Sequence, residues 1–244
     1  MKSNEKKRFI AYDVYEKLAD AYAEQIETKP HNAYLERPAT LSLLPDIKEK
    51  YILDVGCGPG VYSEWLVRHG GKVIAIDASP RMIYHAKKRL GNTVDVKLYD
   101  LREPLTFLEK NTVDVVLAPL VMDYIEDWVP VFCEFRRVLK DDGMFIFSVG
   151  HPFIDNFLKE GVIDYFAIDL VKIRWKTWGV QVLMPSYRRP LKAITSPLYE
   201  AGFLIEQILE AQPTAEYKEV DPKGYEKVSK RPSFICIKAI SKQT

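Results

Sequence analysis

The sequence lacks the excess of one charge sign that a protein usually carries when its main partner is a phosphate backbone. Among its 244 residues, 35 Lys and Arg nearly balance 34 Asp and Glu, which gives a formal net charge of +1. Neutralising phosphates takes a surplus of basic side chains. The balance therefore argues against nucleic acid as a partner, although a local basic patch is compatible with it.

Long apolar runs are also missing. The longest, such as residues 144–149, are far shorter than the roughly 20 residues that span a bilayer. Polar and charged residues fill positions 1–8 with no apolar stretch behind them, so no secretion signal is expected. Three widely spaced cysteines, Cys57, Cys133 and Cys236, suit reduced thiols. These absences predict a cytoplasmic protein without a membrane segment.

Metal-ligand spacing is absent from the cysteines and the four histidines, so no metal site is predicted. What the sequence does contain is ordinary for a globular protein, with 47% hydrophobic and 28% charged residues. The length suits one large α/β domain with a modest insertion. No feature indicates an oligomeric state.

Strand, turn and helix patterns alternate from Tyr51 onward. Ser79 can cap a helix that has Pro80 at its first position and Gly91 just past its end. Repeated β-α-β units of this kind predict a parallel sheet with helices on both faces. The expected strands are residues 51–55, 72–76, 94–98, 113–117 and 144–149, and the other expected helices of this region are residues 61–69 and 128–139.

The patterns divide the chain into four parts. Residues 1–45 form a helical cap, and residues 46–150 carry the alternating units. The aromatic-rich residues 151–190 form an insertion, in which two alternating runs flank the turn Trp178-Gly179 and indicate a possible β-hairpin. Residues 191–244 supply one helix and the last two strands of the sheet, expected at residues 191–201, 203–211 and 233–240.

The loop after the first strand indicates the class of cofactor. Its spacing is Gly-x-Gly-x-Gly from Gly56 to Gly60, and Val61 stands where a dinucleotide fingerprint has its third Gly. Asp54 would repel a pyrophosphate, but it can orient an ammonium group directly or through water. The loop therefore suits an amino acid joined to a nucleoside. An NAD-dependent oxidoreductase is the alternative that Val61 argues against.

Five ordered motifs resemble those of the class I S-adenosylmethionine (SAM)-dependent methyltransferases, and of the type 11 family in particular. They are residues 52–60 (ILDVGCGPG), 76–82 (IDASPRM), 100–101 (DL), 113–116 (VDVV) and 135–143 (FRRVLKDDG). The resemblance implies a Rossmann-like α/β fold with a seven-stranded, mostly parallel sheet, residues 46–150 as the SAM-binding domain, and S-adenosylhomocysteine (SAH) as the product. A Gly-rich structural turn in another α/β protein is the alternative.

The resemblance also implies roles for individual residues. Asp77 would accept hydrogen bonds from both ribose hydroxyls, and Asp100 from the adenine amine. Met82 would cover the adenine, although ordinary core packing explains it almost as well, and Arg37 would pair with the SAM carboxylate or be a solvated helix residue. The full set of expected cofactor-binding residues is Tyr22, Arg37, Asp54, Gly56, Cys57 (through its backbone amide), Gly58, Asp77, Ala78, Met82, Asp100, Leu101, Ala118 and Pro119.

Methyl transfer is a direct displacement, so alignment and exclusion of water matter more than a catalytic triad. His151, after the fifth strand, is the candidate base. The alternative is that the same histidine orients the lid. The insertion is expected to be a substrate lid with an aromatic wall that includes Phe157. Arg188 and Arg189 are expected either to meet an anionic group of the acceptor or to form a solvated pair. The expected substrate residues are Asp123, Tyr124, Phe153, Trp178 and Arg189.

The predicted function is methylation of a small organic molecule on O, N or C. The alternatives are a tRNA- or protein-modifying methyltransferase on the same fold, and a SAM-binding protein without catalysis. The near-neutral charge argues against the tRNA-modifying alternative.

Overall fold

The computed structural model describes residues 8–153, 164–176 and 178–241. Most of the predicted lid falls within these ranges, but residues 154–163, with Phe157, lie outside the described residues.

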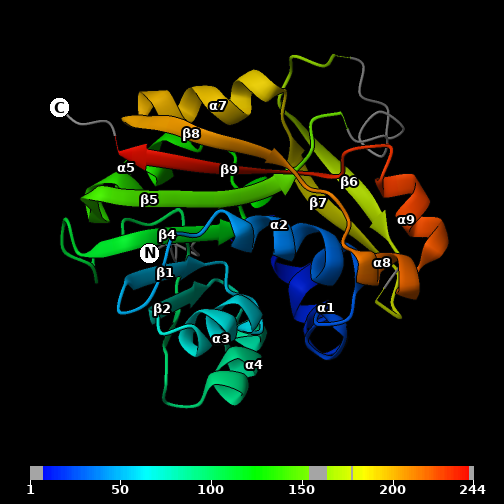
Figure 1. Cartoon of the computed structure of the whole chain (residues 1–244), viewed down its shortest axis with the longest axis horizontal. Coiled ribbons are helices and arrows are strands. Elements are labelled where there is room, and N and C mark those ends of the chain that lie inside the picture. The colour runs from blue at the N-terminus through cyan, green and yellow to red at the C-terminus, as the bar shows by residue number, and fades with distance from the viewer. Residues whose placement is uncertain (1–7, 154–163, 177, 242–244) are drawn as a thin grey trace, which may run out of the picture.

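A seven-stranded sheet with the order β3-β2-β1-β4-β5-β9-β8 forms the centre of the molecule (Figure 1). The five strands from β3 to β5 pair in parallel, and β9 runs antiparallel to both β5 and β8. The predicted seven-stranded, mostly parallel sheet is thus confirmed. The bounds are β1 Tyr51–Val55, β2 Lys72–Asp77, β3 Asp95–Leu98, β4 Val113–Pro119, β5 Leu139–Gly150, β8 Phe203–Glu210 and β9 Phe234–Ser241.

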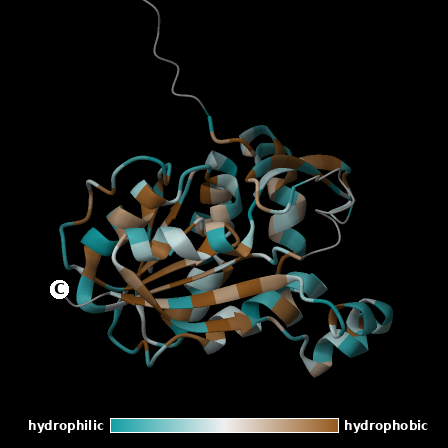
Figure 2. Ribbon diagram, turned by 90° about the horizontal axis from the view of Figure 1, so that it is seen from above, coloured by the Kyte–Doolittle hydropathy of each residue, from teal (hydrophilic) through white to brown (hydrophobic). Residues whose placement is uncertain are grey.

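Helices cover both faces of this sheet. One face packs its apolar side chains against α5 and α7, and the other against α2, α3, α4, α8 and α9. The strands are apolar along most of their length, as Figure 2 shows, because the central ones are buried on both sides. The bounds are α2 Arg37–Ser42, α3 Val61–Arg68, α4 Pro80–Leu90, α5 Val129–Val138, α7 Leu191–Glu200, α8 Ala215–Val220 and α9 Pro222–Val228.

The N-terminal helices and the hairpin form a second layer over the carboxyl ends of the strands. Helix α1 (Tyr12–Gln25) packs on α4 and shares a small apolar cluster with the hairpin, in which Leu18 and Met184 are buried. A π-helix, η1 (Asn32–Glu36), leads from α1 into α2. The predicted hairpin is present as a separate two-stranded sheet, β6 (Asp169–Trp175) with β7 (Val182–Arg188).

Two local predictions are wrong. Helix α5 ends at Val138 and the chain enters β5 at Leu139, so Asp142 and Gly143 lie inside the strand, next to a bulge opposite Val113 and Val115. Helices α8 and α9 were not predicted. Each is shorter than two full turns and mostly polar, so neither shows the periodicity from which a helix is read.

Within the described ranges, no helix combines the length and the apolar character needed to cross a bilayer.

Replacing Phe132 by Ala tests the packing of α5 on the sheet. Phe132 is fully buried among the rings of Trp128, Phe135, Phe145 and Phe147. We expect the free energy of unfolding in urea to fall by about 3–5 kcal/mol, because the cluster cannot close the cavity left behind.

The control is Tyr84→Ala on α4, whose side chain is 64% exposed. That change is expected to alter the stability by no more than about 0.5 kcal/mol. Equal losses in the two variants would contradict the packing described here.

Candidate functional site

A cavity of about 600 Å³ opens at the carboxyl ends of the parallel strands. Val55 at the end of β1, Ile76 in β2 and Pro119 at the end of β4 all line it. Strand β1 has β2 on one side and β4 on the other, so the strand order reverses here, which is where doubly wound sheets bind ligands. The cavity lies under α1, the hairpin and α9, which close its outer side.

The glycine loop forms one wall of the cavity. Gly56 and Gly58 have φ angles of +67° and +53°, in the left-handed region that favours glycine. A Cβ on Gly56 would lie 2.5 Å from Cγ2 of Val121, so only glycine fits there. A Cβ on Gly58 would meet nothing within 4 Å, because this glycine faces the open cavity.

Asp77 anchors this loop to the end of β2. Its Oδ2 accepts a hydrogen bond from the Gly58 amide at 2.9 Å, and its Oδ1 accepts one from the Ser79 amide at 2.8 Å. Desolvation raises the pKa of Asp77 to about 6, against the lowering effect of these amides. The carboxylate is therefore ionised at neutral pH and presents its remaining lone pairs to the cavity.

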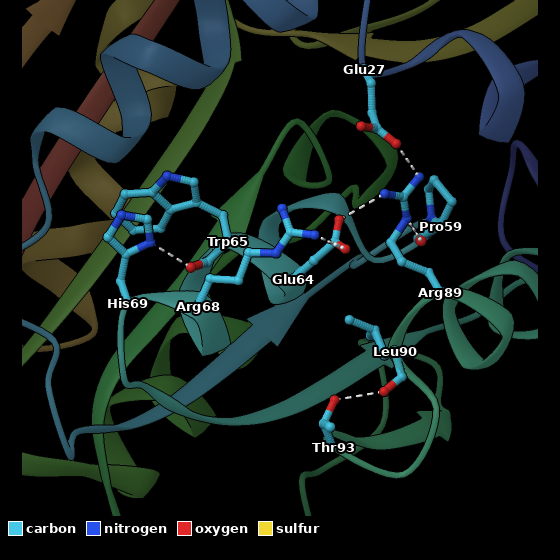
Figure 3. Close-up of polar contacts among 9 residues, drawn as sticks. All are labelled: Glu27, Pro59, Glu64, Trp65, Arg68, His69, Arg89, Leu90 and Thr93. Carbon is cyan, nitrogen blue, oxygen red and sulfur yellow. Dashed lines mark hydrogen bonds and ion pairs between the residues drawn. The ribbon is translucent and has the colours of Figure 1, made fainter.

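Arg89 on α4 holds the same loop from the other side, as Figure 3 shows. Its Nε donates to the Pro59 carbonyl at 3.0 Å, and its terminal nitrogens bind Glu64 of α3 at 2.8 Å and Glu27 at 2.6 Å. One guanidinium thus ties the loop, α3 and the segment after α1 together. The sequence analysis missed this residue, because its partners are up to 62 positions away and no motif marks them.

Asp54 is not in the cavity wall. It is fully buried behind the loop and accepts a hydrogen bond from Ser63 Oγ at 2.5 Å, while its Oδ1 has no partner among the described residues. Burial raises the pKa of Asp54 to about 7, against the lowering effect of the Ser63 hydrogen bond. Asp54 therefore joins β1 to α3, and the expected contact with a ligand ammonium is not provided by this geometry.

The opposite wall carries an acid and a tyrosine pair. Asp123 accepts a hydrogen bond from the Gly150 amide at 3.1 Å, and desolvation raises its pKa to about 6. The hydroxyls of Tyr15 and Tyr124 lie 2.7 Å apart. Burial raises the pKa of both phenols above the ordinary value, so both stay protonated near neutral pH.

Asp100 and Leu101 line the cavity beyond β3. The carboxylate of Asp100 also holds Arg102 with a side-chain contact of 2.6 Å, so it is positioned before any ligand arrives. Met82 lines the cavity and is also buried, so its position is compatible with both readings of this residue. Of the residues expected from the sequence, the structure places in the lining Tyr22, Gly56, Gly58, Asp77, Ala78, Met82, Asp100, Leu101, Pro119, Asp123, Tyr124, Phe153 and Trp178.

Three further cofactor candidates lie outside the lining. Arg37 donates to the Ile26 carbonyl at 2.8 Å and so holds the end of α1. The backbone amide of Cys57 donates to the Ile76 carbonyl at 3.0 Å, which leaves it no free donor for a ligand. Ala118 is fully buried inside β4, one position before the lining begins at Pro119.

His151 also lies outside the lining, which corrects its expected role as the base. Its Nδ1 accepts from the Phe153 amide at 3.2 Å, and its Nε2 lies 2.9 Å from Oε1 of Glu210. Both ring nitrogens are thus engaged, and the ring is 3% exposed. The geometry favours the alternative reading, a histidine that positions the backbone where the insertion begins.

Arg188 and Arg189 are buried, so neither expectation for this pair holds. Arg189 donates to the carbonyls of Ile125 and Glu126 and packs its guanidinium over the Trp128 ring. Arg188 binds backbone carbonyls and Asp169 at the base of the hairpin. Both arginines organise the segments beside the cavity rather than its surface.

Apart from Tyr22, the part of the wall that comes from outside residues 50–190 was not predicted from the sequence. Tyr15 stood on the apolar face of the first predicted helix, which was the one available signal. The other missed side chains follow no motif and lie in segments that pack over the sheet. They include Phe9, Lys29, His31, Asn32, Lys227, Arg231, Ser233 and Phe234.

Comparison with known proteins finds a methyltransferase domain family whose profile matches residues 53–147. An uncharacterised protein of Haemophilus influenzae is 30% identical over 228 residues, which are 85% of this chain and 87% of that protein. A malonyl-[acyl-carrier protein] O-methyltransferase of Hamiltonella defensa is 28% identical over 54% of this chain and 51% of its own length. The chain therefore spans about half of that relative.

Among solved structures, one from Listeria monocytogenes, assigned as an S-adenosylmethionine-dependent methyltransferase, superposes with a TM-score of 0.70. It is 26% identical and covers 93% of this chain and 99% of its own. The match extends over the N-terminal helices and the C-terminal strands as well as the central domain.

The raised pKa of Asp54 predicts how stability depends on pH. An unfolded Asp ionises near pH ~3.9, whereas folded Asp54 holds its proton to about pH 7, so stability falls as the pH rises between these values. Asp54→Asn removes the ionisable group and with it this pH-dependent part of the stability. Between about pH 5 and pH 8, we expect the free energy of unfolding of the variant, relative to that of the wild type, to rise by roughly 2–3 kcal/mol. Urea unfolding at both pH values measures it.

The amide still accepts the Ser63 hydrogen bond, and any cost of its extra N–H is the same at both pH values. Asp142→Asn, an exposed carboxyl on β5, is the control and should not change the pH dependence. Parallel pH profiles for wild type and Asp54→Asn would show that Asp54 is ionised in the folded protein throughout.

Proposed function

The chain belongs to the class I SAM-dependent methyltransferases, and on that premise we propose that its methyl acceptor is a small organic molecule bound in the cavity beside the glycine loop. The observation that carries this proposal is that the glycine loop and the aromatic wall face the same cavity of about 600 Å³. That volume suits a nucleoside cofactor together with a small second ligand.

The residues of the loop fit SAM. The open face of Gly58 allows an amino-acid chain to approach the backbone closely. SAM has no pyrophosphate, so the third glycine of a dinucleotide fingerprint, which Val61 replaces, is not needed. Asp77 is ionised and preorganised by two amides, so it can accept from vicinal hydroxyls of a ribose. Asp100 and Leu101 follow β3 in the position suited to an adenine, with Met82 on the adjoining wall.

SAM supplies a methyl group on a sulfonium, which departs as a neutral thioether. The work of the chain is then to hold the acceptor in line and to keep water out. Tyr15, Tyr124 and Trp178 supply apolar surface for this purpose, since the two phenols stay protonated and their hydroxyls form a hydrogen bond with each other.

Asp123 is the group that we assign to the acceptor side of the cavity. With a pKa of about 6 it is ionised at cellular pH, and Gly150 fixes one of its oxygens. It can accept a hydrogen bond from an acceptor hydroxyl or amine and take its proton on transfer. His151 is not available for this step, because both of its nitrogens are engaged.

Replacing Gly58 by Val tests the cofactor site. The new side chain would project into the cavity, where nothing of the protein stands, and would fill the space of the ligand. We expect calorimetric affinity for SAH to fall by at least about 100-fold. Gly202→Val is the matched control, because Gly202 also has a positive φ and open space around its Cβ position, but lies after α7. Retained SAH binding in folded Gly58→Val would contradict the site.

The acceptor class is tested by following the release of SAH from SAM with a panel of small acids, phenols and amines. Turnover of at least one member is expected, and Asp123→Asn should lower kcat on that acceptor while SAH affinity is kept. Turnover only on tRNA or on protein would replace the small-molecule proposal by the corresponding alternative. SAH binding without turnover on any substrate class would favour a non-catalytic SAM-binding protein.

A further inference from the structure

Positive and negative side chains line different parts of the cavity. The acids that the described residues contribute to the wall are Asp77 at the end of β2, Asp100 after β3 and Asp123 after β4. The basic side chains in the wall come from the segments that cover the sheet: Lys29 and His31 between α1 and η1, Arg174 in β6, Lys227 in α9 and Arg231 just after it. The cavity therefore has an acidic floor and a basic cover.

Four of these basic residues make up what we call the basic end. They are Lys29 and His31 between α1 and η1, Lys227 on α9 and Arg231 just after it. Desolvation lowers the pKa of His31, and the nearby charges of Lys227 and Lys29 lower it further while Asp221 raises it. Lys29 and Lys227 thus both lie near His31, although they are nearly 200 positions apart in the sequence. Lys29, Lys227 and Arg231 all line the cavity, so a ligand bound there would meet several basic side chains.

Specific contacts build the basic end. The Thr214 amide donates to the Tyr34 carbonyl at 2.9 Å, which docks α8 on η1. The Tyr217 hydroxyl lies 3.0 Å from Nδ1 of His31, with the Tyr217 ring fully buried. These contacts fix α8 and α9 against the N-terminal helices, and α9 then carries Lys227 to the cavity.

Aromatic rings adjoin the basic end. Nζ of Lys29 lies 4.9 Å from the centroid of the Trp178 ring, and that ring packs on Tyr22 at 4.5 Å. Trp175 and Phe234 also line the cavity. An acceptor in this region would meet flat apolar walls and, at one end, several positive charges.

From this arrangement we propose that the methyl acceptor is a small, mainly apolar molecule with an anionic group, a carboxylate or a phosphate, which the basic end holds. The inference rests on the proposed function and names its substrate class. Lys227 and Arg231 bind the anion, with Lys29 beside them, and charge-assisted hydrogen bonds are about twice as strong as neutral ones. Asp123 and the acidic floor repel the anionic group, so the acceptor points its other end toward the loop where the methyl donor binds.

An anion contact at Arg188 and Arg189 was one of the two expectations from the sequence, and the structure buries both residues elsewhere. The basic end moves this contact to residues of the N-terminal and C-terminal segments. Its side chains come from the segments that cover the sheet, and we assign it to the acceptor rather than to the nucleoside part of the cofactor.

The test measures binding of three matched probes to the SAH complex of the whole protein by calorimetry: 2-naphthoate, 2-naphthyl phosphate and 2-naphthamide. The two anions are expected to bind at least about tenfold more tightly than the neutral amide, and the tighter of the two identifies the anionic group. Equal affinities for all three probes, or no binding of either anion, would overturn the inference.

Lys227→Met, Arg231→Met and the double variant locate the contact. The double variant is expected to bind the preferred anion at least about tenfold more weakly, with unchanged affinity for SAH and for the amide. Lys223→Met is the matched control, because Lys223 lies one turn before Lys227 on α9 but outside the cavity lining, and it should bind as the wild type does.

Loss of SAH affinity in the same variants would show that the cations serve the cofactor instead, and would overturn the inference. Failure of the wild type to bind SAH would overturn the proposed function itself. SAH binding without discrimination between acid and amide would overturn the substrate class alone.

Discussion

The amide of Gly58 donates to the carboxylate of Asp77, and this hydrogen bond, next to the one from the Cys57 amide to the Ile76 carbonyl, joins the glycine loop to the neighbouring strand of the sheet. It forms because Gly58 takes a left-handed conformation that turns its N–H toward β2 and its bare Cα toward the cavity. The same carboxylate is left ionised with unused lone pairs. One carboxylate thus helps to fix the loop and, in the proposed function, would also accept from the ribose.

This contact is useful only because the surrounding structure holds its two ends still. Arg89 ties the loop to α3 and to the segment after α1, and Asp54 joins β1 to α3 from behind through Ser63. Burial raises the pKa values of Asp54 and Asp77, which costs stability at neutral pH. Buried acids with raised pKa values beside a ligand-binding loop are more typical of functional sites than of structural turns.

The cavity combines two layers of different origin. The sheet supplies the acids and the loop at its strand ends, whereas α1, the hairpin and α9 supply aromatic and basic side chains from above. The floor therefore suits a cofactor that the fold family shares, and the cover suits an acceptor that varies between members. Arg188 fixes the preceding segment of the insertion to the hairpin, and Arg189 fixes the end of the hairpin to the loop at Ile125.

The sequence by itself determined the sheet, most of the helices beside it, and the glycine loop with Asp77. Short apolar runs with turn residues between them mark parallel strands directly, and Gly56, Gly58 and Asp77 lie within about twenty positions of one another, so local pattern carries their relation. Only the tertiary structure decided the rest. Short polar helices such as α9 have no readable periodicity, and whether a side chain such as His151 or Lys227 faces a cavity or a neighbour depends on contacts between segments far apart in the chain.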